Sequence, residues 1–148
     1  MFAISNILLI FAYINKQKME NLKKQRVIRT ERGWAGHFCL ADSCQFKRNT
    51  LLSYKDINIV VSTVGNLVIN GKLKTLGGDD RYYETMAFHS DVNDKRFHDI
   101  DVSREISFDC DSAILKLNAD DEANKMHEDV VFEITTKLEH GYRFENYI

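Results

Sequence analysis

The chain has 148 residues, of which 44% are hydrophobic and 28% are charged, and it contains no Pro. This size fits one globular domain with a single core, and the absence of Pro excludes a Pro-rich linker between domains. The net charge of −2 divides unevenly: residues 1–89 carry 13 Lys and Arg against 7 Asp and Glu (+6), and residues 90–148 carry 7 against 15 (−8). Such an asymmetry can steer a polyanion or a basic protein patch toward one face.

The first segment, residues 1–14, is mostly apolar and is followed by Lys16 and Lys18. It is shorter than the roughly 20 residues of a membrane-spanning helix, and it lacks the basic start and the cleavage pattern of a signal peptide. Met19 is an alternative start of the native chain. We therefore interpret residues 1–18 as an extension and 19–148 as a single domain. If the extension is ordered, we expect it to pack as a short helix or strand against the core or a second copy.

Short apolar and β-branched runs predict strands from about residue 25 onward. The runs 25–30 and 34–40 are the first two. Residues 41–43 are expected to form a turn, after which 45–52 returns as a strand or an irregular edge.

Residues 57–64 form the clearest predicted strand, because a nearly continuous apolar run is typical of a covered central strand. Gly65-Asn66 then matches a glycine-first hairpin turn, with 67–69 returning. Asn70-Gly71 is a second possible turn, so the register stays open. Residues 72–80 are expected to form a loop.

Two further strands are predicted at 81–89 and 101–108, with a polar turn at 91–99 between them. The short connections leave no room for parallel crossovers, so the sheet is expected to be an antiparallel meander.

The period then changes to that of an amphipathic helix, which is expected to run from a cap at Asn118 to about His140 and to stop at Gly141. Opposite charges four residues apart predict ion pairs on the helix surface, between Asp121 and Lys125 and between Glu133 and Lys137. The sequence thus predicts an α+β fold, in which a meander of about five or six strands packs against one long C-terminal helix.

Several side chains suggest chemistry without forming a known motif. His37 could lower the pKa of the Cys44 thiol and so produce a nucleophilic thiolate. A free Cys, however, is more often a small buried hydrophobic residue. His37 with Glu84 or Asp101 suits acid–base catalysis. The C-x4-C spacing of Cys39 and Cys44 does not match a zinc site, and three Cys cannot all pair, which favours a reducing cytoplasm.

Basic and aromatic residues alternate between Lys16 and Arg48, and Arg81 with Tyr82 extends this composition. Nucleic-acid binding needs cations for phosphates and rings for unstacked bases, although a solvated basic face is an equally good interpretation. The residues predicted to contact a partner or nucleic acid are Arg32, Trp34, His37, Arg48, Arg81 and Tyr82. A second aromatic contact surface is suggested by Phe132, Tyr142, Phe144 and Tyr147.

Six segments carry a resemblance to a known family. They are RGWAGHF (32–38), FKRNTLL (46–52), IVVSTVG (59–65), RYYETMAF (81–88), DVSREISF (101–108) and ADDEANKMHEDVV (119–131). In these segments the chain resembles a family of small uncharacterised proteins found across bacterial genomes, plasmids and prophages. The similarity covers about residues 26–140 and leaves residues 1–18 outside. The family has no activity to carry over, so the resemblance implies no catalytic residue.

In size and composition the chain also resembles anti-CRISPR proteins directed at a type VI-B RNA-guided RNA nuclease. This resemblance implies a phage or other mobile element as the source, and an inhibitor that binds the effector nuclease or its guide RNA without a cofactor. We therefore expect a cytoplasmic, non-enzymatic interaction protein with a protein or ribonucleoprotein partner, and no catalytic residue, metal or membrane partner. The alternatives are a small hydrolase or nucleic-acid-processing enzyme using His37 with Glu84 or Asp101, and a regulatory or housekeeping binding module.

Overall fold

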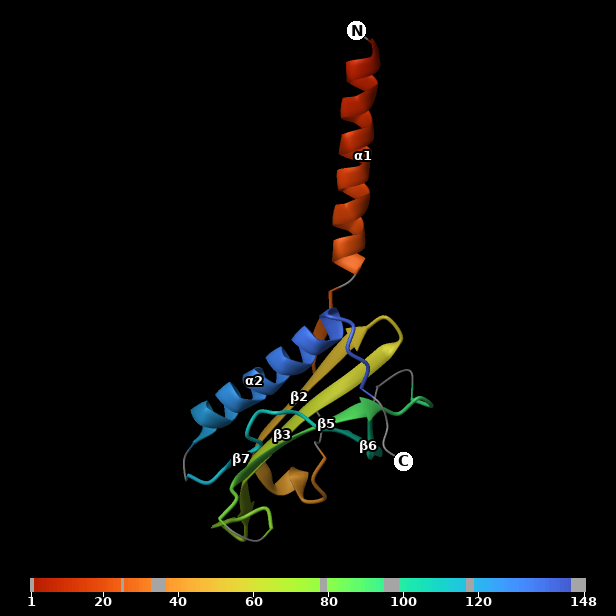
Figure 1. Cartoon of the computed structure of the whole chain (residues 1–148). Helices are drawn as coiled ribbons and strands as arrows, with labels where there is room; N and C mark the ends of the chain where they lie inside the picture. Colours follow the sequence, from red (N-terminus) through yellow and green to blue (C-terminus); the bar gives the residue numbers. More distant parts are fainter. Residues whose placement is uncertain are drawn as a thin grey trace.

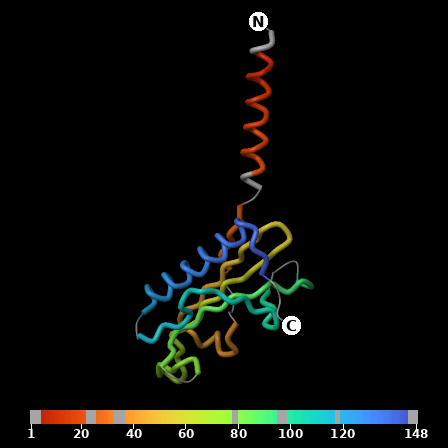
Figure 2. The backbone as a smooth tube through the Cα atoms, in the orientation of Figure 1, coloured from red at the N-terminus to blue at the C-terminus, as the bar shows by residue number. Residues whose placement is uncertain are grey.

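The computed structural model describes residues 2–24, 26–32, 37–77, 80–94, 99–116 and 119–144. Over these residues the fold is α+β, as predicted, with a seven-stranded antiparallel sheet and two helices. The long helix α2 (Asp120–Glu139) lies across the sheet, and helix α1 (Phe2–Lys24) projects from the rest of the molecule (Figure 1). The backbone trace in Figure 2 shows the same separation of α1 from the sheet.

The main path of the sheet has the order β1-β2-β3-β5-β6, and two short strands pair outside it. Every pairing is antiparallel. The strands on the main path are β1 (Ile28–Arg32), β2 (Cys44–Tyr54), β3 (Ile57–Ile69), β5 (Tyr83–Ser90) and β6 (Ile100–Ile106). The short strands are β4 (Lys72–Lys74), which pairs with β3, and β7 (Ala113–Ile114), which pairs with β5.

The predicted turn at Gly65-Asn66 is wrong, because β3 continues through both residues and pairs Gly65 with Phe46 on one side and with Tyr83 on the other. A Cβ at Gly65 would lie 2.3 Å from Tyr83 Cδ1, so the glycine permits a close approach of neighbouring strands. The chain turns instead at the alternative site, Asn70-Gly71, where both residues have positive φ. The following strand β4 falls within the predicted loop at 72–80.

One other strand prediction needs correction. Residues 37–40 form bends and a turn, followed by the short 3-10 helix η1 (Ala41–Ser43). His37 bonds to Ser62 and Phe38 packs against a buried cluster that includes Val64 of β3, so the segment lies against the sheet and not within it. The part of that run before His37 lies outside the described residues. Residues 45–52 form a strand, which confirms the first of the two alternatives, and this strand β2 lies between β1 and β3 and not at an edge. The two-residue strand β7 was not predicted.

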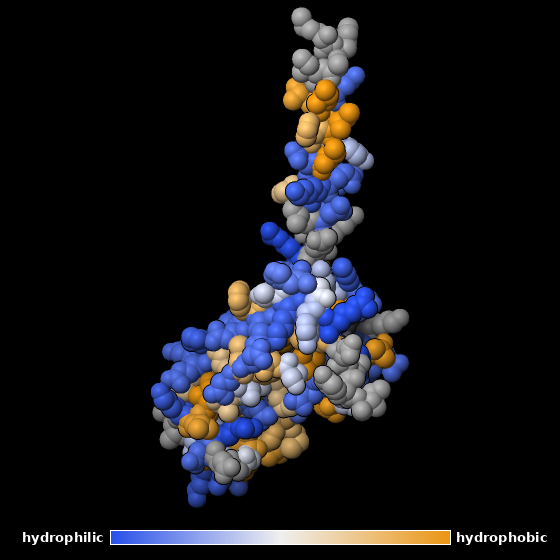
Figure 3. Space-filling model, in the orientation of Figure 1, coloured by the Kyte–Doolittle hydropathy of each residue, from blue (hydrophilic) through white to orange (hydrophobic). Residues whose placement is uncertain are grey.

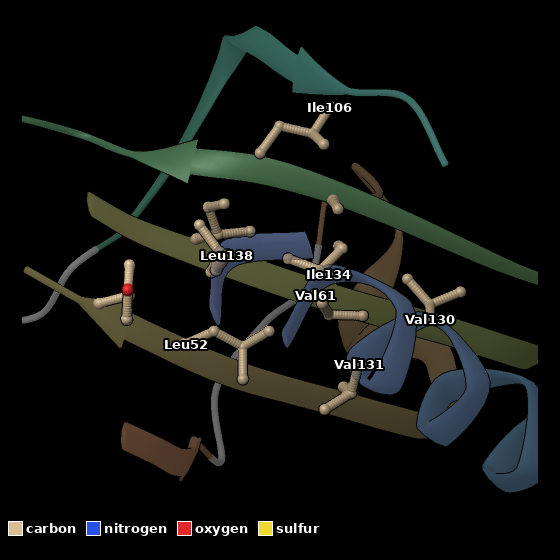
Figure 4. Packing of buried hydrophobic residues seen from close by; sticks show 10 residues of the cluster. Leu52, Val61, Ile106, Val130, Val131, Ile134 and Leu138 are labelled. Carbon is tan, nitrogen blue, oxygen red and sulfur yellow. The ribbon is translucent and has the colours of Figure 1, made fainter. Parts of the chain in front are cut away.

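The core lies between the sheet and α2 (Figure 4). Val130, Ile134 and Leu138 recur on one face of α2 and are completely buried against the sheet, and each such side chain contributes roughly 1.5–3 kcal/mol on burial. The other labelled side chains of this cluster are Leu52, Val61, Ile106 and Val131. On the outer side of the sheet, Ala41 and Cys44 pack against strand β3.

Helix α2 is one of the best predicted elements. It begins at Asp120, after Ala119 and without a side-chain cap, and the expected cap residue Asn118 lies outside the described residues. Gly141 follows the helix with φ +81, as expected for a stop. Its surface holds the predicted pair Glu133–Lys137 at 3.2 Å, whereas Lys125 binds Asp129 at 2.8 Å instead of the predicted Asp121.

Helix α1 does not pack against the core as the sequence suggested. Its large apolar side chains between Ile7 and Ile14 are all more than half exposed. The helix runs without a break from the proposed extension into residues 19–24. Within the described residues, no helix combines the length and the apolar character needed to cross a membrane.

Candidate functional site

The structure brings His37 and Arg81 near the same carboxylate, that of Glu84, but it does not gather all the described contact residues on one surface. Arg48 bonds to residues of α2, while His37 lies on the opposite face of the sheet, where it bonds to Ser62. Arg32 ends β1, and Arg81 with Tyr82 precedes β5. Tyr82 packs partly against the core. The sixth residue, Trp34, lies outside the described residues.

Arg48 takes part in an internal ion network. Its guanidinium lies 2.9 Å from Glu128 and 3.1 Å from Glu31, and Arg29 bonds to both carboxylates at 2.6 Å. Hydrogen bonds from Arg29 are the main reason that the pKa of Glu128 is lowered to about 2. The network joins β1 and β2 to α2. Because Arg48 is bonded within it, we assign this arginine a structural role.

A buried histidine continues this network into the core. Both ring nitrogens of His127 lie 2.7 Å from threonine hydroxyls, Nε2 from Thr50 and Nδ1 from Thr63. The hydroxyl of Thr50 also donates to Glu31, and that of Thr63 lies 2.7 Å from Thr85. Burial lowers the pKa of His127 to about 4, so the imidazole is neutral near pH 7, with one nitrogen donating and the other accepting.

His37 and Glu84, which the sequence suggested as a catalytic pair, come close on the outer face of the sheet. His37 Nδ1 lies 2.8 Å from Ser62 Oγ, and Nε2 lies 4.0 Å from Glu84, beyond hydrogen-bond distance. Arg81 lies 3.6 Å from the same carboxylate. Burial lowers the pKa of His37 to about 4. The other proposed partner, Asp101, lies on β6, where it accepts a hydrogen bond from Ser103.

Cys44 and Cys110 lack the lowered thiol pKa of an activated nucleophile, and Cys39 is exposed. Burial raises the pKa of the Cys44 thiol. The pKa of Cys110 is raised to about 11, first by burial and then by its hydrogen bond to Glu133. Among the described residues, no group of three or more His, Cys, Asp or Glu side chains is arranged to hold a metal.

An open cleft of about 670 Å³ lies where the β2–β3 turn and the ends of β5 and α2 meet. A volume between about 300 and 1,000 Å³ is typical of small-ligand sites. The turn contributes Lys55, whose positive φ of 54° tightens the hairpin. The lining residues are Tyr54, Lys55, Asp56, Ile57, Asn58, His89, Ser90, Asp91, Val92, Arg104, Leu138, Gly141, Tyr142, Arg143 and Phe144.

Hydrogen bonds at the end of α2 direct the chain along the cleft. The N–H of Tyr142 donates to the Lys137 carbonyl, and the N–H of Gly141 donates to that of Leu138. This pair of bonds, with Gly141 in the left-handed region, is a Schellman motif. His89 Nε2 then donates to the Phe144 carbonyl at 3.2 Å and fixes the returning segment.

Cationic and aromatic side chains share the cleft. Lys55, Arg104 and Arg143 outnumber the lining carboxylates Asp56 and Asp91. The pKa of His89 is lowered by burial and then by Arg104, which keeps its imidazole neutral.

The ring of Tyr142 is half exposed and packs edge-on against Phe144, with 4.9 Å between centroids. Lys137 lies over the same tyrosine ring at 5.7 Å from its centroid. Of the aromatic surface suggested by the sequence, Phe132 is 73% exposed but does not line the cleft, and Tyr147 lies outside the described residues.

The sequence did not predict this site as a whole, because its cations come from separate segments that no local motif joins, although Tyr142 and Phe144 belong to the aromatic surface that the sequence suggested. Lys55, Arg104 and Arg143 are far apart in the chain and meet only when the sheet forms. Two features of the sequence could have indicated the site. They are Lys55 in a tight turn and Arg143 shortly after Gly141, the glycine that ends the helix.

No family model matches the chain, and no curated protein or solved structure matches it either.

Proposed function

We propose that the chain is a non-enzymatic interaction protein that binds single-stranded RNA in the cleft at the end of α2. The observation that carries this proposal is the combination of Lys55, Arg104 and Arg143 with the half-exposed ring of Tyr142 around one open space of about 670 Å³. The resemblance to anti-CRISPR inhibitors suggests the guide RNA of an RNA-guided nuclease as the ligand, and the cytoplasm as the place of action.

The chemistry of the cleft suits one or two unstacked nucleotides. Proteins bind single strands by stacking bases on aromatic rings and by neutralising phosphates with Lys and Arg. Tyr142 supplies the ring, and Arg143 next to it supplies a cation. A base within a duplex is already stacked on its neighbours, so a double-stranded RNA should bind more weakly.

The carboxylates of the cleft limit how many phosphates it can hold. Asp56 and Asp91 leave a surplus of one positive charge among the ionised lining residues, since three cations face two carboxylates. With about one phosphate neutralised, log K should fall with log salt at a slope of about −0.7 on a single strand. We therefore expect moderate affinity with a shallow salt dependence.

The test is fluorescence anisotropy of a labelled single-stranded RNA oligonucleotide titrated with the full chain. Tyr142→Ala should weaken binding about fivefold or more, because stacking one base contributes about 1–3 kcal/mol. Arg48→Ala is the matched control: this arginine is bonded within the ion network, so its loss should leave RNA affinity unchanged.

Equal losses for Tyr142→Ala and Arg48→Ala would contradict the cleft as the binding site. A second assay adds the chain to an RNA-guided RNA nuclease loaded with guide RNA. Inhibition that Tyr142→Ala removes would support the inhibitor role. RNA binding without inhibition would instead indicate a regulatory binding module.

One observation favours a second candidate, an enzyme that uses His37. Its Nε2 is buried without a hydrogen-bond partner among the described residues, 4.0 Å from Glu84. A neutral imidazole beside a carboxylate suits a general base, although Ser62, on the other ring nitrogen, is completely buried. Hydrolysis of RNA or of a model ester that His37→Gln abolishes in a folded chain would support this candidate. Absence of hydrolysis by the wild-type chain would exclude it for those substrates.

A further inference from the structure

Helix α1 exposes apolar side chains on every side. Ile7, Leu8, Leu9, Ile10, Phe11, Tyr13 and Ile14 are each between 52% and 66% exposed. Five of them are consecutive, and because each residue of a helix turns by about 100°, five consecutive positions go around its whole circumference. Figure 3 shows orange, hydrophobic atoms on α1, away from the body of the molecule.

This arrangement argues against a protein partner that covers one face. A coiled coil with a second copy needs an apolar seam, and a groove needs an apolar stripe, with polar side chains elsewhere. On α1 either partner would leave apolar side chains such as Leu8 or Ile10 in water on the uncovered side. A helix that is apolar all round is typical of an environment that surrounds it completely.

Charge is distributed along α1 in the order that a lipid surface requires. Residues 2–14 contain no charged side chain, whereas residues 15–26 contain five Lys or Arg and one Glu. The uncharged part is about 20 Å long at 1.5 Å per residue. The hydrocarbon core of a bilayer is about 30 Å thick, so this part is longer than one leaflet and shorter than two. Anionic headgroups attract a basic segment that lies beside the membrane.

We propose that α1 inserts residues 2–14 into one face of an anionic lipid bilayer, with the basic segment 15–26 at the headgroups. The described sheet and α2 then remain on the aqueous side. The sequence argument against a membrane partner concerned a spanning helix, and a helix that enters one leaflet does not need to span. This site is separate from the RNA cleft, because no described residue of α1 lines the cleft.

The experiment is flotation of the full chain with vesicles of phosphatidylcholine containing a minority of phosphatidylglycerol. The wild-type chain should float with these vesicles, and it should bind less to pure phosphatidylcholine. The double variant Leu9→Glu, Ile10→Glu should lose at least about tenfold in bound fraction, because charged side chains are excluded from hydrocarbon. Phe132→Glu is the matched control: Phe132 is 73% exposed on α2, so its replacement should leave flotation unchanged.

Three outcomes would overturn the proposal. The first is that the wild-type chain does not float, and the second is that the double variant still floats. The third is that light scattering shows an oligomer for the wild type and a monomer for the double variant, which would show that a second copy covers α1. The RNA affinity of the double variant should equal that of the wild type.

Discussion

Two buried histidines perform different tasks in this molecule. His127 has both ring nitrogens bonded to threonines of the sheet, and it therefore fixes the position of α2 over β2 and β3. His37 has one bonded nitrogen and one without a hydrogen-bond partner among the described residues, beside Glu84. The difference in bonding is why we assign His127 to structure and keep His37 as the candidate for chemistry. A buried polar atom without a hydrogen bond costs free energy, which makes it worth testing for function.

Replacing His127 with Leu tests its structural task. Leucine fills much of the same volume but bonds to neither Thr50 nor Thr63, so we expect the free energy of unfolding to fall by about 2–3 kcal/mol. Urea unfolding followed by circular dichroism measures this change. Phe132→Leu, at an exposed position of the same helix, should stay within about 0.5 kcal/mol of the wild type. Equal stabilities for the two variants would show that the bonds of His127 contribute nothing.

Strand β3 is the element on which the sheet is built. It pairs along most of its length with both β2 and β5, and it carries β4 near its end. Two parts of β3 have different roles. Its start, with the turn before Ile57, lines the cleft, and Gly65, nearer the other end, leaves room for the ring of Tyr83. The hydroxyl group of Tyr83 in turn donates a 2.5 Å hydrogen bond to the carboxylate of Asp120 in the first turn of α2. A substitution at Gly65 that displaces Tyr83 should therefore also disturb the hydrogen bond between this tyrosine and α2.

We expect Gly65→Ala to reduce the free energy of unfolding by about 2–3 kcal/mol. The new methyl group would meet Tyr83 Cδ1 at 2.3 Å and the Tyr82 carbonyl oxygen at 2.7 Å, so the strands must move apart. Gly71→Ala is the control, because nothing lies within 4 Å of its Cβ and only its φ of +75 opposes the substitution. That control should cost about 1 kcal/mol. The same loss in both variants would mean that packing at Gly65 is not tight.

Considered as a whole, the molecule should lose stability in acid. Burial lowers the pKa of both His37 and His127 from 6.5 to about 4. The unfolded chain therefore binds more protons than the folded one below pH 6.5, and stability falls as the pH drops from about 6.5 to 4. Each histidine contributes up to about 3 kcal/mol to this loss, at about 1.4 kcal/mol per pKa unit. The lowered pKa of Glu128, about 2, extends the loss below pH 4.5.

Urea unfolding at several pH values between 4 and 7 measures this dependence. His37→Gln keeps a polar group beside Ser62 but cannot take up a proton, so the slope of stability against pH should be smaller in this variant. A slope equal to that of the wild type would contradict a lowered pKa at His37.

The parts of the fold that the sequence predicted well are those with a strong local period. The apolar positions of α2 from Ala123 to Leu138 repeat as a helix requires, and they are buried as expected. The turn predicted at Gly65-Asn66 was wrong, because the sequence alone does not distinguish a glycine that forms a turn from a glycine that makes room for a tyrosine ring on the next strand. Of the two carboxylates that the sequence suggested for His37, Glu84 lies nearby at 4.0 Å, beyond hydrogen-bond distance, and Asp101 lies on β6. The cleft was not predicted, because its members meet only through the pairing of β2, β3 and β5.

Binding of RNA at the end of α2 can be examined by NMR titration of the full chain, labelled with nitrogen-15, with a short single-stranded RNA. We expect the amide signals that shift to belong to the β2–β3 turn, to residues 89–92 and to residues 138–144. Signals of Arg32 and Arg81, which lie outside the cleft, should stay in place. Shifts centred on Arg32 and Arg81, with no change at Lys55 or Tyr142, would contradict the proposed site.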